Sequence, residues 1–297
     1  MSQIALVGPA TPLGAQVKPQ LEAAGIRAEE IEFFSPMPGP GVGVGEHGVT
    51  DYDGAAEWVK SVMSENLQKA RLVLLCEPLP EGVPAPPQAA IFDLPASLRG
   101  AARLPLWQGT GIPTPGLRRF PAPSALLLSR LLPLFPGAAD ARVTHLASAT
   151  ECFDEGAEKL IDDARRLLSG ADGFDAETSA IFNLRPQGGE AQAGFIADFS
   201  ALLPGQKPPA FNRLTGGQFH CGLLLVELAG TAMPGAWPTG WQLGPFASVQ
   251  SAAGLEAPLF TCEPLAGGLR LQIAYDPFSA ALFPALHHAL RELTADA

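Results

Sequence analysis

The sequence is poor in cysteine and in basic residues, and both shortages exclude whole classes of protein. Its four cysteines lie far apart and form no CxxC pair, so the sequence predicts neither a zinc site nor a disulfide framework. The 297 residues contain 19 lysines and arginines against 30 aspartates and glutamates, which gives a formal net charge of -11. Because nucleic-acid binding depends on clustered basic side chains, we expect no nucleic-acid partner.

Long apolar runs are also absent. The stretch SALLLSRLLPLF is interrupted by Arg130 and Pro133, so it cannot supply the ~20 apolar residues that a membrane span needs. The first residues, MSQIALVG, lack the basic start and the long apolar segment of a signal peptide. These observations predict a cytoplasmic protein that does not enter a membrane.

Strand-like and helix-like segments alternate in the first third of the chain. Residues 3–8, QIALVG, predict a strand, and residues 13–25 predict a helix that ends at Gly25. Residues 53–70, DGAAEWVKSVMSENLQKA, have an amphipathic pattern and predict a second helix. The apolar runs RLVLLCEP and QAAIFDLP are typical of strands in a parallel sheet covered on both faces. This order predicts a doubly wound, Rossmann-type α/β domain.

The rest of the chain is richer in strands. The segments AFNRLTGG and FHCGLLLVELAG predict strands, and the AGG of PLFTCEPLAGGLRLQIAYD predicts a hairpin turn. Residues 151–170 predict an amphipathic helix. We therefore expect a Rossmann-type domain of residues 1–121, on which a C-terminal helix of residues 278–297 packs, and an α+β domain with a mixed sheet from residue 122 to 277.

The stretch IALVGPATPLG places Gly8 and Gly14 on either side of the first strand-to-helix turn. In a dinucleotide-binding turn a middle glycine lets the backbone approach the pyrophosphate. Thr11 stands at that place, and Pro12 after it has no N–H to donate. The sequence thus keeps two of the three glycines of such a turn. This pattern indicates the fold of the turn rather than an intact cofactor site.

Several anchors occur in the order found in one known family. They are IALVGPATPLG against its strand and GATGxVG turn, AAIFDLPASLR with Asp93, IFNLRPQ with Asn183, QFHCG with His220, and GLRLQIAYDPFSAALFPAL with Asp276. Over nearly its whole length the chain thereby resembles the aspartate-semialdehyde dehydrogenase family, including its USG-1-type homologues. The resemblance implies a two-domain fold that dimerises through the second domain, and NADP-dependent chemistry with a cysteine nucleophile and a histidine acid/base.

The family's nucleophile lies in an N-C-[ST] motif at a helix start, where the helix N-terminus favours the thiolate. The corresponding stretch here is FPAPSALLL, in which Ala122 and Pro123 take the places of the asparagine and the cysteine. Proline is favoured at the first position of a helix but cannot act as a nucleophile. A shift of one residue would offer Ser124, which needs an adjacent base to become reactive. The resemblance therefore predicts that the helix is kept and the nucleophile is lost.

Further family positions are altered in the same sense. Ala147 replaces the glutamine that orients the substrate, and Gln218 replaces the arginine that binds its carboxylate. The family residues that contact the cofactor 2′-phosphate correspond to positions near Met37 and Pro38, in the segment SPMPGPG that begins at Ser35. His220 is retained, and a histidine can transfer protons near neutral pH.

Together these replacements favour a non-catalytic homologue that serves as a homodimeric scaffold or binding protein, with neither NADP nor NAD bound. An alternative is an active NAD(P)-dependent oxidoreductase with altered chemistry that uses His220 as an acid. A third is a sensor that binds a metabolite without turning it over. Cys152 is the candidate for a reactive thiol. No metal is expected, because the adjacent His287 and His288 cannot share one face of a helix.

Overall fold

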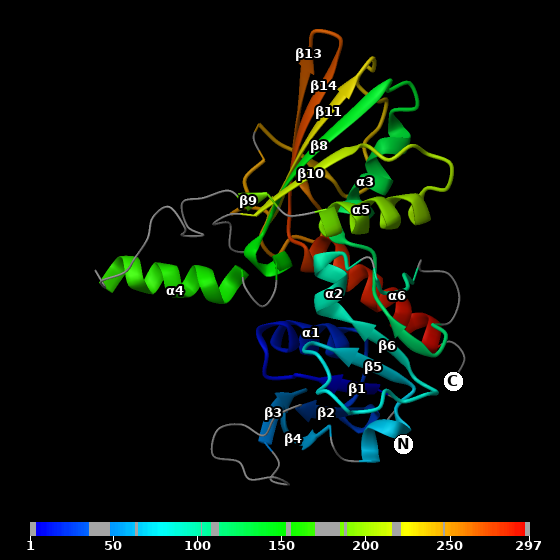
Figure 1. Ribbon diagram of the computed structural model, residues 1–297, viewed down its shortest axis with the longest axis vertical. Helices are drawn as coiled ribbons and strands as arrows, with labels where there is room; N and C mark the ends of the chain where they lie inside the picture. The colour runs from blue at the N-terminus through cyan, green and yellow to red at the C-terminus, as the bar shows by residue number, and fades with distance from the viewer. Residues whose placement is uncertain are drawn as a thin grey trace. The chain divides into compact units, whose positions relative to one another are not determined.

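The computed structural model describes most of the chain, which divides into two compact units (Figure 1). The described residues are 4–35, 48–62, 65–101, 103–107, 113–152, 156–169, 185–186, 189–215, 221–245 and 247–294. Unit 1 comprises Met1–Ser97, Leu104–Phe120 and Phe283–Ala297, and unit 2 comprises Leu98–Arg103 and Pro121–Leu282.

Unit 1 is built on a seven-stranded sheet. Across the sheet the strands are β3 (Gly48–Tyr52), β4 (Ala55–Ser61), β2 (Ile31–Ser35), β1 (Ile4–Val7), β5 (Leu72–Leu75), β6 (Ala90–Asp93) and β7 (Gly116–Arg118). All neighbours are parallel except β3 and β4. Every residue of β1 and β5 is buried, as expected of apolar strands covered on both faces.

The helical elements of unit 1 follow from local signals. They are α1 (Pro12–Ala23), the 3-10 turns η1 (Ala28–Glu30) and η2 (Glu65–Lys69), α2 (Leu94–Arg99), which ends in unit 2, and α6 (Phe283–Thr294). Helix α1 ends before Gly25, whose φ of +80° suits a residue without a side chain. Helix α6 packs on α1, where His287 Nε2 lies 3.2 Å from the carbonyl oxygen of Gln20.

The helix expected over residues 53–70 is wrong. That segment forms strand β4 and turn η2, and β3 and β4 make a hairpin in which Tyr52 pairs with Ala55. The two turn residues, Asp53 and Gly54, have φ values of +51° and +71°. Asp-Gly in a two-residue hairpin loop is a strong local signal for this turn, and it overrides the helical spacing of the apolar residues that follow.

Unit 2 contains a second seven-stranded sheet of mixed direction. Its strands are, in order, β12 (Gln242–Leu243), β13 (Leu259–Leu265), β14 (Gly268–Tyr275), β11 (Gly222–Ala229), β8 (Asp140–Ala147), β10 (Ala210–Thr215) and β9 (Arg185–Pro186). β8 and β10 run parallel, whereas β11 is antiparallel to both β8 and β14. The expected hairpin is confirmed, because β13 and β14 pair across Ala266 and Gly267.

Helices cover one face of this sheet. The helical elements of unit 2 are α3 (Pro123–Leu131), η3 (Leu132–Leu134), η4 (Ala149–Cys152), α4 (Gly156–Ser169), α5 (Gly189–Leu202) and the π-helical turn η5 (Phe278–Leu282). Helices α3 and α5 pack together, and their side chains share a buried apolar core with alternate residues of the strands, including Leu127, Phe199, Phe211, Leu224 and Ile273. The α/β fold class, with a parallel first sheet and a mixed second sheet, is confirmed.

Candidate functional site

The first candidate site is the turn between β1 and α1, which leaves the sheet of unit 1 at its carboxyl edge. Gly8 has a φ of +81°, a conformation that residues with side chains rarely adopt. A Cβ on Gly14 would lie 2.1 Å from the carbonyl oxygen of Gly8. Both glycines are therefore required for the turn to form and for α1 to approach β1 closely, whether or not a ligand binds.

Thr11 and Pro12 occupy the rim of this turn. Thr11 is the N-cap of α1, and its Oγ1 accepts a hydrogen bond from the Gly14 N–H at 3.0 Å and donates one to the Gly8 carbonyl at 2.8 Å. The Thr11 N–H also donates to the Gly8 carbonyl, at 3.2 Å. Pro12 has no N–H. The N–H groups of Thr11 and Gly14 are therefore bonded within the turn, where a pyrophosphate would otherwise use such donors.

A carboxylate also lies against the turn. Glu77 follows β5, the parallel neighbour of β1, and strands β2 and β5 flank β1 on opposite sides. The carboxyl edge of such strands, where the chain changes direction across the sheet, is the usual ligand crevice of this architecture. A Cβ on Gly8 would lie 2.8 Å from Glu77 Cγ and 2.9 Å from its Oε1. Burial raises the pKa of Glu77. Sequence reasoning missed this residue, which only the pairing of β1 with β5 brings to Gly8.

The second candidate site is the start of α3 in unit 2. Pro123 is the first residue of the helix and is buried, and Ala122 is an N-cap without a side-chain hydrogen bond. The Ala122 N–H donates to Asp198 Oδ2 at 2.8 Å. Ser124 is also buried, at 4% exposure. The helix start thus presents no thiol, and the N–H of its N-cap residue is bonded to an aspartate of α5.

A buried polar cluster lies at the end of β8 on the helix-covered face, where Ala147 is fully buried. Tyr275 Oη lies 2.7 Å from His145 Nε2 and donates to Glu151 Oε1 at 2.9 Å. His145 Nε2 is 3.4 Å from Glu151 Oε2, which accepts the Ser148 N–H at 2.9 Å. All three side chains are at most 1% exposed. We call His145, Glu151 and Tyr275 the buried triad.

The electrostatics of the buried triad follow from its burial. Burial lowers the pKa of His145, although Glu151 partly offsets the effect. For Glu151 burial favours the neutral acid, but His145, Arg213 and the Ser148 N–H outweigh it and lower its pKa to about 2. The Tyr275 hydroxyl donates its hydrogen bond to Glu151, so the hydrogen bond between Tyr275 and His145 must be donated by the Nε2–H of the histidine. The buried Nδ1 of His145 has no hydrogen-bond partner.

Gly222 makes the buried triad possible. It pairs with Tyr275 across β11 and β14, and a Cβ at this position would lie 2.6 Å from both Cζ and Oη of the tyrosine. The phenol ring therefore lies over the glycine backbone and reaches His145. The cluster joins three strands and the turn η4 with no exposed atom for a substrate, so its arrangement supports the fold rather than chemistry.

Other residues singled out from the sequence have structural roles or lie outside the described residues. His220, Gln218, Met37 and Asn183 lie outside them, as does the Cys152 side chain. Ser35 ends β2, and its carbonyl accepts the Val62 N–H at 3.2 Å.

Two anchor aspartates cap helices. Asp93 Oδ1 accepts the Ala96 N–H in the first turn of α2. Asp276 Oδ1 accepts the N–H groups of Phe278 and Ser279 at the start of the last helical segment, and its Oδ2 accepts the N–H of Gly254 from a separate turn. Both aspartates that the chain shares with the family therefore have a structural role, the capping of a helix, that needs no catalytic function.

The remaining cysteines are not activated. Burial raises the pKa of Cys76, and burial together with Asp276 and Glu151 raises that of Cys221 to about 12. Within the part of the chain that the structure describes, no group of three or more His, Cys, Asp or Glu side chains could hold a metal. None of the helices in those residues is long and apolar enough to cross a membrane.

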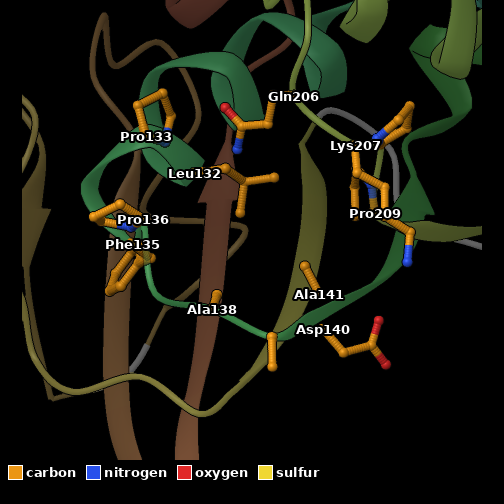
Figure 2. A pocket seen from close by; sticks show the side chains of 12 residues that line it. Leu132, Pro133, Phe135, Pro136, Ala138, Asp140, Ala141, Gln206, Lys207 and Pro209 are labelled. Atoms are coloured by element: carbon orange, nitrogen blue, oxygen red, sulfur yellow. The ribbon is translucent and has the colours of Figure 1, made fainter.

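A pocket of about 430 Å³ lies at the amino ends of β8 and β10 (Figure 2). It is lined by the loop after α3 and the loop after α5, with Leu132 and Phe135 as apolar walls and Gln206 above them. Ala147 stands at the opposite end of β8. The pocket is therefore separate from the polar groups at the carboxyl end of that strand.

Comparison with known proteins identifies the fold. No family model matches the sequence, and no curated protein matches it. Among solved structures, aspartate semialdehyde dehydrogenase II of Vibrio cholerae, complexed with ASA, matches with a TM-score of 0.74 at 15% identity and covers 99% of this chain and 98% of its own. A probable aspartate-semialdehyde dehydrogenase of Pseudomonas aeruginosa gives 0.73 at 16% identity, over 100% and 99% of the two chains. The enzyme of Candida albicans with NADP gives 0.59 at 9% identity, over 99% of both. The chain thus has the fold of these enzymes along nearly its full length.

Proposed function

We propose that this chain is a non-catalytic protein on the aspartate-semialdehyde dehydrogenase fold, a homodimeric scaffold or binding protein that binds neither NADP nor NAD. The observation that carries the proposal is the closed turn between β1 and α1. Three features of the turn disfavour the binding of a pyrophosphate. The Gly14 N–H is hydrogen-bonded to Thr11, Pro12 has no N–H to donate, and the Glu77 carboxylate lies over Gly8. A dinucleotide would lose hydrogen bonds and meet like charge, so the residues do not fit the cofactor.

The start of α3 supports the same proposal. Covalent chemistry on an acyl group needs a thiolate or an activated hydroxyl at the place where Ala122 and Pro123 stand. Pro123 is buried and chemically inert, and Ser124 is buried in the first turn of the helix. Ala147, at the position of the orienting glutamine, offers no polar group.

A homodimer is proposed from the resemblance and from the second sheet. On the face of that sheet opposite α3 and α5, β11 presents Leu223 and Leu225, which are only half-buried in the single chain. Half-buried leucines in the middle of a sheet are suited to contact with another subunit.

Calorimetric titration of the purified protein with NADP and NAD tests this function. We expect no saturable binding and no turnover of aspartate semialdehyde. The combined variant Thr11→Gly, Pro12→Ala and Glu77→Ala should acquire weak NADP binding, because it restores the donors and removes the carboxylate. Glu81→Ala, which removes an exposed charge from the same loop, is the matched control and should stay silent. Saturable micromolar binding by the natural protein, with turnover that depends on His220, would favour the oxidoreductase instead.

A further inference from the structure

The pocket at the amino ends of β8 and β10 has the size and the lining of a small-molecule site. Its volume of about 430 Å³ falls within the range of ligand pockets, which are mostly apolar and contain a few polar groups that fix the orientation of the ligand. Leu132 and Phe135 form its apolar walls and are 3% and 4% exposed. Its described lining residues all belong to unit 2, and none of them belongs to the two candidate sites or to the buried triad.

Proline shapes this pocket and limits what its backbone can offer to a ligand. Four of its twelve described lining residues are prolines, two in each loop, namely Pro133, Pro136, Pro208 and Pro209. Proline fixes its own φ and has no N–H, so both loops are restricted, which favours a pre-formed cavity. The N–H groups of Phe135, Ala138 and Ala139 are already bonded to backbone carbonyl oxygens. A ligand therefore finds few donors on the backbone around it.

Two side chains supply the available donors. Gln206 is half-buried, and its amide group points toward the Leu132 wall (Figure 2), whereas Lys207 is exposed. Among the residues that the structure describes, neither side chain has a hydrogen-bond or ion-pair partner. The Asp140 carboxylate, which also lines the pocket, is paired with Arg142, whose Nε lies 3.3 Å from Asp140 Oδ2. The charge that remains available at the pocket is therefore positive.

We propose that this pocket binds a small carboxylate with an apolar body, of the aliphatic or aryl-alkyl acid class. The apolar body packs against Leu132, Phe135 and the proline rings, and the carboxylate accepts hydrogen bonds from the Lys207 ammonium group and the Gln206 amide. Removal of the apolar body from water drives binding, and the charge-assisted contact orients the ligand. The proposal adds a ligand class to the binding role of the proposed function, but it rests on unit 2 alone.

Other occupants suit these residues less well. A peptide that is recognised through its backbone needs N–H donors for its carbonyl groups, and the four lining prolines have none. A cationic ligand would meet the Lys207 charge, while the carboxylate among the described lining residues is held by Arg142. An anion without an apolar body would leave the Leu132 and Phe135 walls unused. The residues therefore favour a small amphipathic anion.

Calorimetric titration of the full chain with phenylacetate, and with hexanoate as an aliphatic probe, tests the pocket. We expect saturable binding of both acids and weaker binding of phenylacetamide, which has the same ring but no charge. Lys207→Gln should weaken phenylacetate binding by a factor of about three or more, because it removes a charge-assisted contact at the surface, and should leave phenylacetamide binding unchanged. Lys207→Arg keeps the charge and should keep the affinity. Lys69→Gln, which removes an exposed lysine outside the pocket, is the matched control.

A variant that fills the cavity gives a second test that does not depend on charge. Ala138 is half-buried in the pocket lining, so Ala138→Leu should weaken the binding of phenylacetate and phenylacetamide alike. Ala253→Leu alters an exposed alanine outside the pocket and should have no effect, and circular dichroism establishes that each variant is folded. No saturable binding of either acid at millimolar concentration would overturn the proposal, as would an affinity for phenylacetate that is unchanged in Lys207→Gln or in Ala138→Leu. The NADP titration decides the absence of cofactor independently.

Discussion

The two units place polar groups at comparable points, the carboxyl ends of β1 and β8, and use them differently. In unit 1 the groups lie at the carboxyl edge of the sheet, where Thr11 caps α1 and Glu77 lies over Gly8. In unit 2 the buried triad of His145, Glu151 and Tyr275 is sealed inside the core. We expect that substitution can open the first arrangement at little cost, whereas a change in the second lowers the free energy of unfolding. In unit 1 the Thr11 side chain bonds to the backbone of its own turn, whereas in unit 2 the side chains bond to one another.

The largest loss in the free energy of unfolding is expected for a substitution in the buried triad of unit 2. Glu151→Ala leaves Arg213 and Tyr275 without the buried carboxylate, and removal of one partner from a buried charged network costs about 3–5 kcal/mol. Chemical denaturation measures the free energy of unfolding. The control Glu263→Ala removes a largely exposed partner of Arg270 and should cost less than about 1 kcal/mol. Equal costs for the two variants would show that the buried triad contributes nothing to stability.

Acid should destabilise unit 2 through the same cluster. Glu151 has a pKa of about 2 in the folded chain against its ordinary 4.5, so its contribution is complete above pH 4.5 and is lost as pH falls toward 2. The lowered pKa of His145 adds a loss that begins as pH falls below 6.5. The free energy of unfolding should therefore fall by a few kcal/mol on acidification. Glu151→Gln, which cannot titrate, should flatten the lower part of the profile; stability that rises with acid would contradict this account.

A smaller loss is expected from Gly222→Ala. The added Cβ would lie 2.6 Å from the Tyr275 ring, so the ring must move away from His145. Overpacking of this kind costs about 1–3 kcal/mol. Gly235→Ala is the matched control, because nothing lies within 4 Å of a Cβ there. If both variants unfold at the same denaturant concentration, the tyrosine is not confined by the glycine.

The smallest effect is expected in unit 1. Thr11→Val removes the cap hydroxyl from α1 and should cost about 1 kcal/mol in the free energy of unfolding. Thr261→Val, on strand β13, has no cap to lose and serves as the control. No loss in Thr11→Val would mean that the hydroxyl is free to serve a ligand, contrary to the closed turn.

Local signals in the sequence were sufficient for much of the fold. The buried strands β1 and β5, the end of α1 at Gly25 and the hairpin at Gly267 each depend on a few neighbouring residues. The helix expected over residues 53–70 failed because Asp53 and Gly54 set a hairpin. Helix α5 was not expected at all, since apolar residues are spread around it rather than gathered on one side.

The candidate sites were less accessible from sequence because they depend on contacts across the chain. Tyr275 and His145 are 130 residues apart and meet only when β14, β11 and β8 pair. Glu77 reaches Gly8 through the pairing of β1 with β5. Tyr275 lies in the closing anchor of the sequence, but nothing local to Tyr275, His145 or Glu77 indicates the residue that each contacts. Thr11 and Pro12, by contrast, follow a strand directly, so their effect on the turn could be predicted.

The central claim is that the glycine turn is kept for its shape and not for a nucleotide. Calorimetric titration of the natural chain with NADP is the most direct test. The account predicts no saturable heat for the natural chain, and weak saturable binding for the combined Thr11→Gly, Pro12→Ala and Glu77→Ala variant. Saturable micromolar binding of NADP by the natural chain would contradict it.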